Sequence, residues 1–412
     1  MRKILAYALL LVGGLTLSQT LPLVAPSLMT TLSPAITLLT LVGLAFIMIR
    51  VGHEFEIDRD DLKAYGKDYA VAMSAAALPW IFVTVYFVFV LLPSGSGMSW
   101  AAWRETLLAG RFAAPTSAGV LFAMLAAAGL AATWVYRKAR VLAIFDDIDT
   151  VLLMIPLKML IVGLAWQLGV VVLVMGILLW IAWRYMHALR IPTTWPWILG
   201  YAVALTIVIE IIYATSKLID PRVPIHVEIL LPAFVLGCVL AKPVRHEVGL
   251  DEKPATIIAG AFMVLVGLSL PPVLAAAGEG ATSYTAAQAY PPAHIIALHV
   301  LAVTALCNLG KMMPLVFYRK EASLRERLGV CVAMFPRGEV GAGVLVVGLS
   351  YGIGGPVLTV AMLSLALNLV LTGAFIMIVK WLIKPRLPKG LRAVPAARRL
   401  TVDPSRRGPA WH

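Results

Sequence analysis

The chain has 412 residues, of which 61% are apolar and only 13% are charged, about half the charged share of an ordinary soluble domain. Its mean hydropathy is +0.91. This composition excludes a soluble globular protein and a disordered chain, and three cysteines are too few for a disulfide scaffold. It predicts an all-α polytopic membrane protein.

Apolar stretches long enough to cross a bilayer recur along the chain. A hydrocarbon core about 30 Å thick needs roughly 20 apolar residues per helix. Twelve spans are expected, near 4–25, 34–51, 69–92, 112–134, 141–164, 166–183, 195–214, 226–241, 255–274, 292–317, 328–351 and 356–379. The first could be a signal peptide, but it has no good small-residue cleavage site, so a retained helix is predicted.

The net charge of +13 could indicate a nucleic-acid-binding protein. If the N-terminus is cytoplasmic, however, 27 of the 34 Lys and Arg residues fall in cytoplasmic loops and termini. The outer loops would then hold only Arg104, Arg111, Lys217 and Arg222, and the spans only Lys158, Lys311 and Arg337. This asymmetry is the positive-inside pattern. It predicts two cytoplasmic termini and no nucleic-acid partner.

The charge distribution also divides the chain into two parts. Residues 1–384 are expected to form one membrane domain. Residues 385–412 are basic and rich in Pro and Ala, and a disordered cytoplasmic tail is predicted there. The tail is either a solvated flank or a contact with anionic lipid.

Three carboxylates lie close together in the fifth span, at Asp146, Asp147 and Asp149. A charge at the bilayer centre costs about 2.5–3.5 kcal/mol, so it is by default a candidate functional group. Two neighbouring carboxylates in a low dielectric cannot easily both stay ionised. Such a site therefore holds a proton, or a cation in place of the proton. The structural alternative is that an aspartate only pairs with a membrane Lys or Arg.

Two spans contain Pro, Gly and polar residues where a helix should be regular. These breaks lie near 115–119 and 335–341. Pro removes an amide donor, and freed carbonyl groups can then face a cation or a partner charge. Breaks at corresponding positions of two inverted repeats are typical of transporters, although two ordinary proline kinks would look similar.

Further ionisable residues also lie inside the predicted spans. Lys311 lies too deep in its span for easy snorkelling, which favours pairing with a span-five carboxylate. Arg337 and Glu339 are expected to hold the helix crossing together through ion pairs, and Lys158 to be a structural partner, for example of Asp149. The possible accessory residues are Asp149, Lys158, Glu210 and Glu228. Glu210 is either a pathway residue or a satisfied core acid.

At these residues the sequence resembles the monovalent cation:proton antiporter superfamily, in the branch of bacterial sodium/proton antiporters. Asp146-Asp147 resembles its ion-binding aspartate pair, Thr116-Ser117 its broken fourth helix and Lys311 the lysine that electrogenic members pair with an aspartate. Further similar segments are Gly52–Lys63, Glu228–Gly237, Phe262–Ser269 and Pro336-Arg337-Gly338-Glu339. The similarities run in order from about residue 45 to residue 380.

The resemblance implies a homodimer in the bacterial inner membrane, with core helices near 69–164 and 292–379 that move against a scaffold. It also implies that Na⁺ and protons compete for the same aspartates, with no cofactor. On this interpretation Asp147 is the main cation ligand and proton carrier, Asp146 is the partner of Lys311, and Thr116 and Ser117 supply oxygen ligands.

Other functions fit less well. A K⁺/H⁺ antiporter and a sodium-coupled solute symporter of similar fold stay open as alternatives. A magnesium-dependent prenyl transferase would need a D-D-x-x-D spacing and a second aspartate motif, and a membrane aspartyl protease would need G-x-G-D. The chain has neither pattern, so no enzymatic activity is expected.

Overall fold

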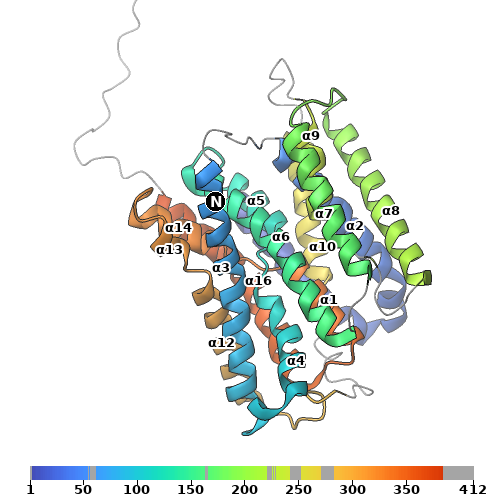
Figure 1. Ribbon diagram of the computed structural model, residues 1–412, viewed down its shortest axis with the longest axis vertical. Coiled ribbons are helices and arrows are strands. Elements are labelled where there is room, and N and C mark those ends of the chain that lie inside the picture. The colour runs from blue at the N-terminus through green and yellow to red at the C-terminus, as the bar shows by residue number, and fades with distance from the viewer. Residues whose placement is uncertain are drawn as a thin grey trace, which may run out of the picture.

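The structure is a computed structural model that describes residues 2–53, 62–162, 166–219, 229–241, 252–270 and 283–383, with residues 55, 225 and 227. These residues form a bundle of helices without any β-strand (Figure 1). The longer helices are α1 (Arg2–Val24), α2 (Pro26–His53), α3 (Leu62–Tyr86), α4 (Trp100–Gly110), α5 (Ala118–Ala127), α6 (Trp134–Val162), α7 (Trp166–Arg184), α8 (Trp195–Ile219), α9 (Leu230–Val239), α10 (Glu252–Leu268), α12 (Ala293–Gly310), α14 (Leu324–Ala333), α15 (Glu339–Ser350) and α16 (Gly355–Ile383). Short helical turns cover Phe87–Leu91, Ser96–Met98, Arg111–Ala113 and Pro314–Phe317, the last being α13.

The prediction of a polytopic helical membrane protein is confirmed. Apart from the span 112–134, each predicted span overlaps a helix or a pair of half-helices in the described part of the chain. Eight described segments are long and apolar enough to cross a membrane, and three shorter apolar helices accompany them. The helix that carries the three aspartates, α6, begins at Trp134 rather than near residue 141.

The predicted span 112–134 is wrong, because the observed segment runs over Trp100–Ala127 as the two half-helices α4 and α5. Charged residues in and next to α4 lower the local hydropathy, but the fold buries two of them, Glu105 and Arg111. The carboxylate of Glu105 accepts the backbone N–H of Thr285 at 2.8 Å. Arg111, expected in an outer loop, is completely buried instead. Local hydropathy cannot detect a charge that the tertiary structure encloses.

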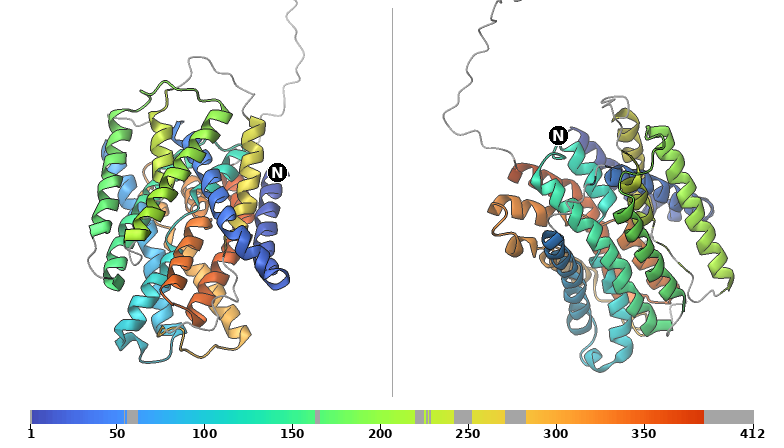
Figure 2. Two further views of the ribbon diagram at one scale, coloured as in Figure 1. Left: turned by 90° about the vertical axis from the view of Figure 1, so that its right-hand side faces the viewer. Right: turned by 45° about the horizontal axis from the view of Figure 1, so that its top comes forward.

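The helices form two groups that lie side by side (Figures 1 and 2). In one group α3, α4, α5 and α6 pack with α12, α14, α15 and α16. In the other, α1 and α2 pack with α8, α9 and α10, and α7 packs on α9. The left view of Figure 2 shows α1 running beside α10. The groups meet where α1 contacts α16, α2 contacts α5 and α6 contacts α9.

Candidate functional site

The two predicted helix breaks lie against each other and are joined by hydrogen bonds. The backbone N–H of Ser117 donates to the carbonyl oxygen of Pro336 at 2.9 Å. The hydroxyl of Thr116 donates to the carbonyl oxygen of Met334 at 3.1 Å. Backbone groups that lose their helical partners at one break are therefore satisfied by the other.

Arg337 ties this crossing to two neighbouring helices. Its guanidinium is fully buried and donates to the carbonyl oxygens of Ala113 at 2.9 Å and Cys307 at 2.7 Å. It also donates to the side-chain oxygen of Asn308 at 3.0 Å and faces that of Asn368 at 3.5 Å. These acceptors are neutral. The side chain of Glu339, which the sequence predicts as an ion-pair partner at this crossing, lies outside the described residues. The planar guanidinium group has five N–H donors that point in different directions, which suits acceptors lying on several sides of it.

Lys311 and Asp146 form a completely buried ion pair beside the first break. The ammonium Nζ lies 2.9 Å from Oδ2 and 3.0 Å from Oδ1 of Asp146, and it also donates to the carbonyl oxygen of Ala114 at 2.6 Å. The backbone N–H of Thr116 donates to Oδ2 of Asp146 at 2.7 Å. This amide lies two residues before α5, where the positive end of the helix dipole also favours a carboxylate.

The position of Lys311 depends on a close approach between α12 and α3. α12 ends at Gly310, directly before Lys311, and a short turn links it to α13 within the span Ala293–Phe317, which agrees with the predicted span 292–317. A Cβ atom on Gly310 would lie 2.4 Å from the backbone nitrogen of Pro79. Only glycine therefore allows the end of α12 to lie this close to α3.

Asp147 faces the boundary between the two groups of helices. Asp147 is 6% exposed and lines a cavity of about 20 Å³, where it is the only charged residue among the described ones. Apolar side chains from α6, α7 and α9 complete the lining, among them Ile148, Met175 and Phe234. A cavity of this size has room for about one water molecule. Asp147 also interacts electrostatically with Lys311.

Asp149 lies one helical turn after Asp146 and is fully buried. It interacts electrostatically with Tyr69 of α3 and with Arg111. Lys158, its expected partner, lies in α6, but its side chain is outside the described residues.

Three predicted residues remain, and the structure describes the side chain of one of them. Glu210 is half-buried on α8, at the outer edge of the bundle in Figure 1. Glu228 lies outside the described residues, as does the side chain of Glu339, whose backbone begins α15.

The sequence prediction missed three residues of this site, namely Arg111 and Tyr69, which interact with Asp149, and Asn368, which faces Arg337. Two of them carried a signal. Arg111 directly precedes the break, and Asn368 interrupts an otherwise apolar span. Tyr69 carried none, because a tyrosine near the end of a span is ordinary.

A separate cluster of ion pairs ties α3 and α6 to the connection between α13 and α14. Lys138 lies 2.8 Å from Asp68 and 3.3 Å from Glu321, and Lys67 lies 2.6 Å from Glu321. The Tyr318 hydroxyl donates to Asp68 at 2.6 Å, and burial and that carboxylate raise the pKa of Tyr318. Burial opposes ionisation of Glu321, but the two lysines outweigh it and hold the pKa of Glu321 below its usual value.

Comparisons with known proteins agree with this architecture. The profile of the family described as "Sodium/hydrogen exchanger, transmembrane" matches residues 4–384. The fold is similar to that of the sodium proton antiporter MjNhaP1 from Methanocaldococcus jannaschii, with a TM-score of 0.56 and 16% sequence identity. The alignment covers 89% of this chain and 92% of the archaeal one. A search of curated protein sequences found no match.

Proposed function

We propose that this chain, which belongs to the sodium/hydrogen exchanger family and is thus a membrane cation/proton antiporter, exchanges Na⁺ for protons by alternating access. Both ions compete for the aspartates of α6. The observation that carries this proposal is the buried pair of Asp146 and Lys311 beside Asp147. It supports an antiporter because a buried carboxylate needs a compensating positive charge, and an ammonium, a metal cation or a proton can each supply one.

In this mechanism Asp147 is the main ligand for the cation and carries the proton back. Asp146 is its acidic neighbour and holds Lys311 when no cation is bound. Thr116 and Ser117 contribute oxygen atoms, which are hard ligands suited to an alkali cation. If two protons exchange for one Na⁺, each cycle moves one net charge, worth about 2.3 kcal/mol per 100 mV.

The two helix groups supply the moving parts. We assign α3–α6 and α12–α16 to a core, and α1, α2 and α7–α10 to a scaffold that carries the homodimer contact. The cavity at Asp147 supports this division, because its walls come from α6 on one side and from α7 and α9 on the other. A shift between the groups would expose the carboxylate first to one side of the membrane and then to the other.

The expected location is a bacterial inner membrane with both termini in the cytoplasm. The support is the positive-inside distribution of Lys and Arg in the sequence. The expected partners are therefore the transported cation, protons and the lipid bilayer, without any bound cofactor or nucleic acid.

The deciding experiment replaces Asp147 by Asn and measures Na⁺-driven pH change in everted membrane vesicles with a fluorescent proton probe. We expect Asp147→Asn to abolish the response, because an amide cannot exchange a proton for a cation. The matched control is Glu210→Gln, a similar change on the peripheral helix α8, which should retain the response. Full activity of Asp147→Asn would overturn the assignment.

Ion choice is tested in proteoliposomes over a range of pH with Na⁺, K⁺ or Li⁺, with and without an imposed voltage. The proposal expects Na⁺ to drive proton counterflow most strongly. A preference for K⁺ would make the protein a K⁺/H⁺ antiporter, and Na⁺ flux without proton counterflow would indicate a symporter.

A further inference from the structure

Arg111 is a completely buried charge in the crossing region, and the mechanism above does not use it. It follows the last residue of α4, where the negative end of the helix dipole favours a cation. Its guanidinium carbon lies 5.2 Å from the centre of the Trp80 ring. That ring is held in turn by a hydrogen bond from its indole N–H to the carbonyl oxygen of Leu107 at 2.8 Å. Two residues of α3 and α4 therefore fix the guanidinium in place.

The hydrogen bonds of Arg111 do not account for its burial. Nη2 donates to the backbone carbonyl oxygen of Asp149 at 3.3 Å. Within the part of the chain that the structure describes, Nε and Nη1 have no hydrogen-bond partner. Arginine stays charged in proteins, and a buried charge needs an opposite charge close by.

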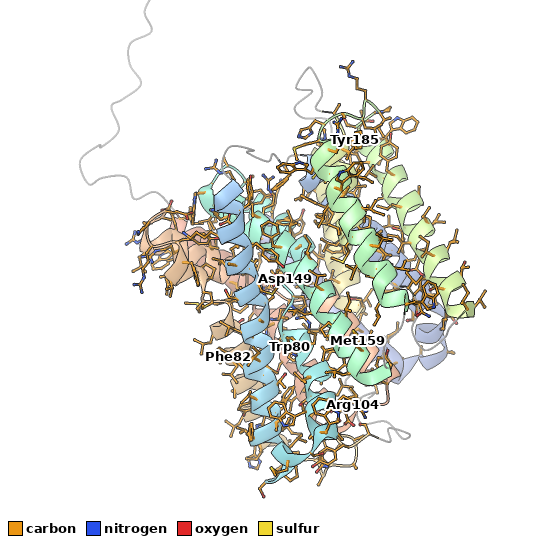
Figure 3. All side chains as sticks on the ribbon, viewed as in Figure 1. Trp80, Phe82, Arg104, Asp149, Met159 and Tyr185 are labelled. Atoms are coloured by element: carbon orange, nitrogen blue, oxygen red, sulfur yellow. The ribbon has the colours of Figure 1, made fainter. Side chains whose placement is uncertain are left out.

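The acids that act electrostatically on Arg111 are Asp146 and Asp149. Asp146 already binds Lys311 and the amide of Thr116. Asp149 is fully buried, and among the described residues its carboxylate interacts with the Tyr69 hydroxyl and with Arg111 but makes no salt bridge with Lys311. Asp149 is thus the acid left to balance Arg111. Figure 3 shows Asp149 on α6 and Trp80 on α3, both near the middle of the bundle.

We propose that Arg111 is a positioning residue of the transport site, which balances the charge of Asp149 beside Asp146 and Asp147. The inference rests on the proposed function. Among the described residues, the buried acids Asp146, Asp147 and Asp149 would otherwise share the ammonium of Lys311 as their exchangeable cation. With Asp149 balanced by Arg111, the exchange of Lys311, Na⁺ and protons is confined to Asp146 and Asp147.

The proposal predicts that removing the charge of Asp149 and removing the charge of Arg111 change the affinity for Na⁺ in opposite directions. Loss of the Asp149 charge leaves the positive charge of Arg111 unbalanced near the site, which repels Na⁺. Loss of the Arg111 charge leaves a negative charge unbalanced, which holds Na⁺ more tightly and slows its release. For unit charges roughly 10 Å apart at an effective dielectric constant of about 20, each change is on the order of tenfold.

The test measures the apparent KM for Na⁺ and the maximal rate of proton counterflow in proteoliposomes with purified full-length variants. We expect Asp149→Asn to raise KM about tenfold and Arg111→Gln to lower KM about tenfold with a slower maximal rate. The double variant should return KM to within about threefold of wild type, and Arg111→Lys, which keeps the charge, should leave KM near wild type.

A merely structural role would not produce opposite shifts. KM shifts in the same direction, or a double variant worse than either single one, would overturn the proposal. If Arg111→Gln does not fold, Asp149→Asn decides alone, because an unchanged KM there contradicts the proposed charge balance. Failure of the proposed function looks different, since wild-type proteoliposomes would then show no Na⁺-dependent proton flux.

Discussion

The Nζ atom of Lys311 lies 2.9 Å from Oδ2 of Asp146, and both side chains are completely shielded from solvent. The pair connects the end of α12 with the middle of α6 and lies against the broken segment that carries Ala114 and Thr116. Any cation that binds Asp146 must therefore compete with an ammonium already in place.

Lys311→Gln should lower the melting temperature of the detergent-purified protein, because it leaves the Asp146 carboxylate buried without its partner. Removing one member of a buried ion pair typically costs about 3–5 kcal/mol. The double variant Asp146→Asn/Lys311→Gln should recover much of this loss. Lys217→Gln, an exposed lysine on α8, is the control and should change stability little. A double variant as unstable as Lys311→Gln would contradict this explanation.

Arg337→Lys should also destabilise the protein, although it keeps the charge. A lysine ammonium cannot reach the carbonyl oxygens of Ala113 and Cys307 together with the Asn308 side chain, so buried acceptors lose their donors. We expect a loss of about 2–4 kcal/mol, seen as a lower melting temperature and a smaller monodisperse peak in size-exclusion chromatography. Arg319→Lys, at an exposed position, should behave like wild type. Equal stability of the two variants would show that the contacts of Arg337 matter little.

Gly310→Ala should reduce both stability and transport. The added methyl group would lie 2.4 Å from a backbone atom of Pro79, so α12 must move away from α3 and carry Lys311 with it. Strain of this kind typically costs about 1–3 kcal/mol. The control is Gly176→Ala on α7, where a Cβ has nothing within 4 Å and where alanine favours the helix. Normal transport by Gly310→Ala would mean that the contact is not required.

Glu321→Gln should show a stability loss that depends on pH. The lysines hold the pKa of Glu321 below its ordinary value of 4.5, so its ionised form is stabilised in the folded protein. This contribution is fully present above about pH 4.5 and is lost as the pH falls through the lower folded-state pKa. The side chain is 32% exposed, so the effect near pH 7 should be at most about 1 kcal/mol. Melting temperatures of wild type and variant should converge as the pH is lowered from 7 to below the folded-state pKa of Glu321, and a constant difference over this range would contradict the assignment.

The first helix break was predicted from the sequence, but the half-helix before it was not. The Pro, Gly and polar residues near 115–119 predicted an interruption, and the structure has one there. The sequence did not show that a half-helix precedes this break, because hydropathy counts the charges of Glu105 and Arg111 as solvent-exposed. In the fold they are buried. The transport roles of Asp147, Thr116 and Ser117 stay predictions.

The sequence alone determined that this is a polytopic membrane protein with two interrupted helices, because a bilayer selects for apolar stretches of fixed length and Pro and Gly mark backbone breaks locally. Only the tertiary structure decided which charges meet. Asp146 pairs with Lys311 across 165 residues of chain, and Arg111 lies beside Asp149 rather than in solvent. Such pairings depend on how distant helices pack, and no local pattern in the sequence encodes that packing.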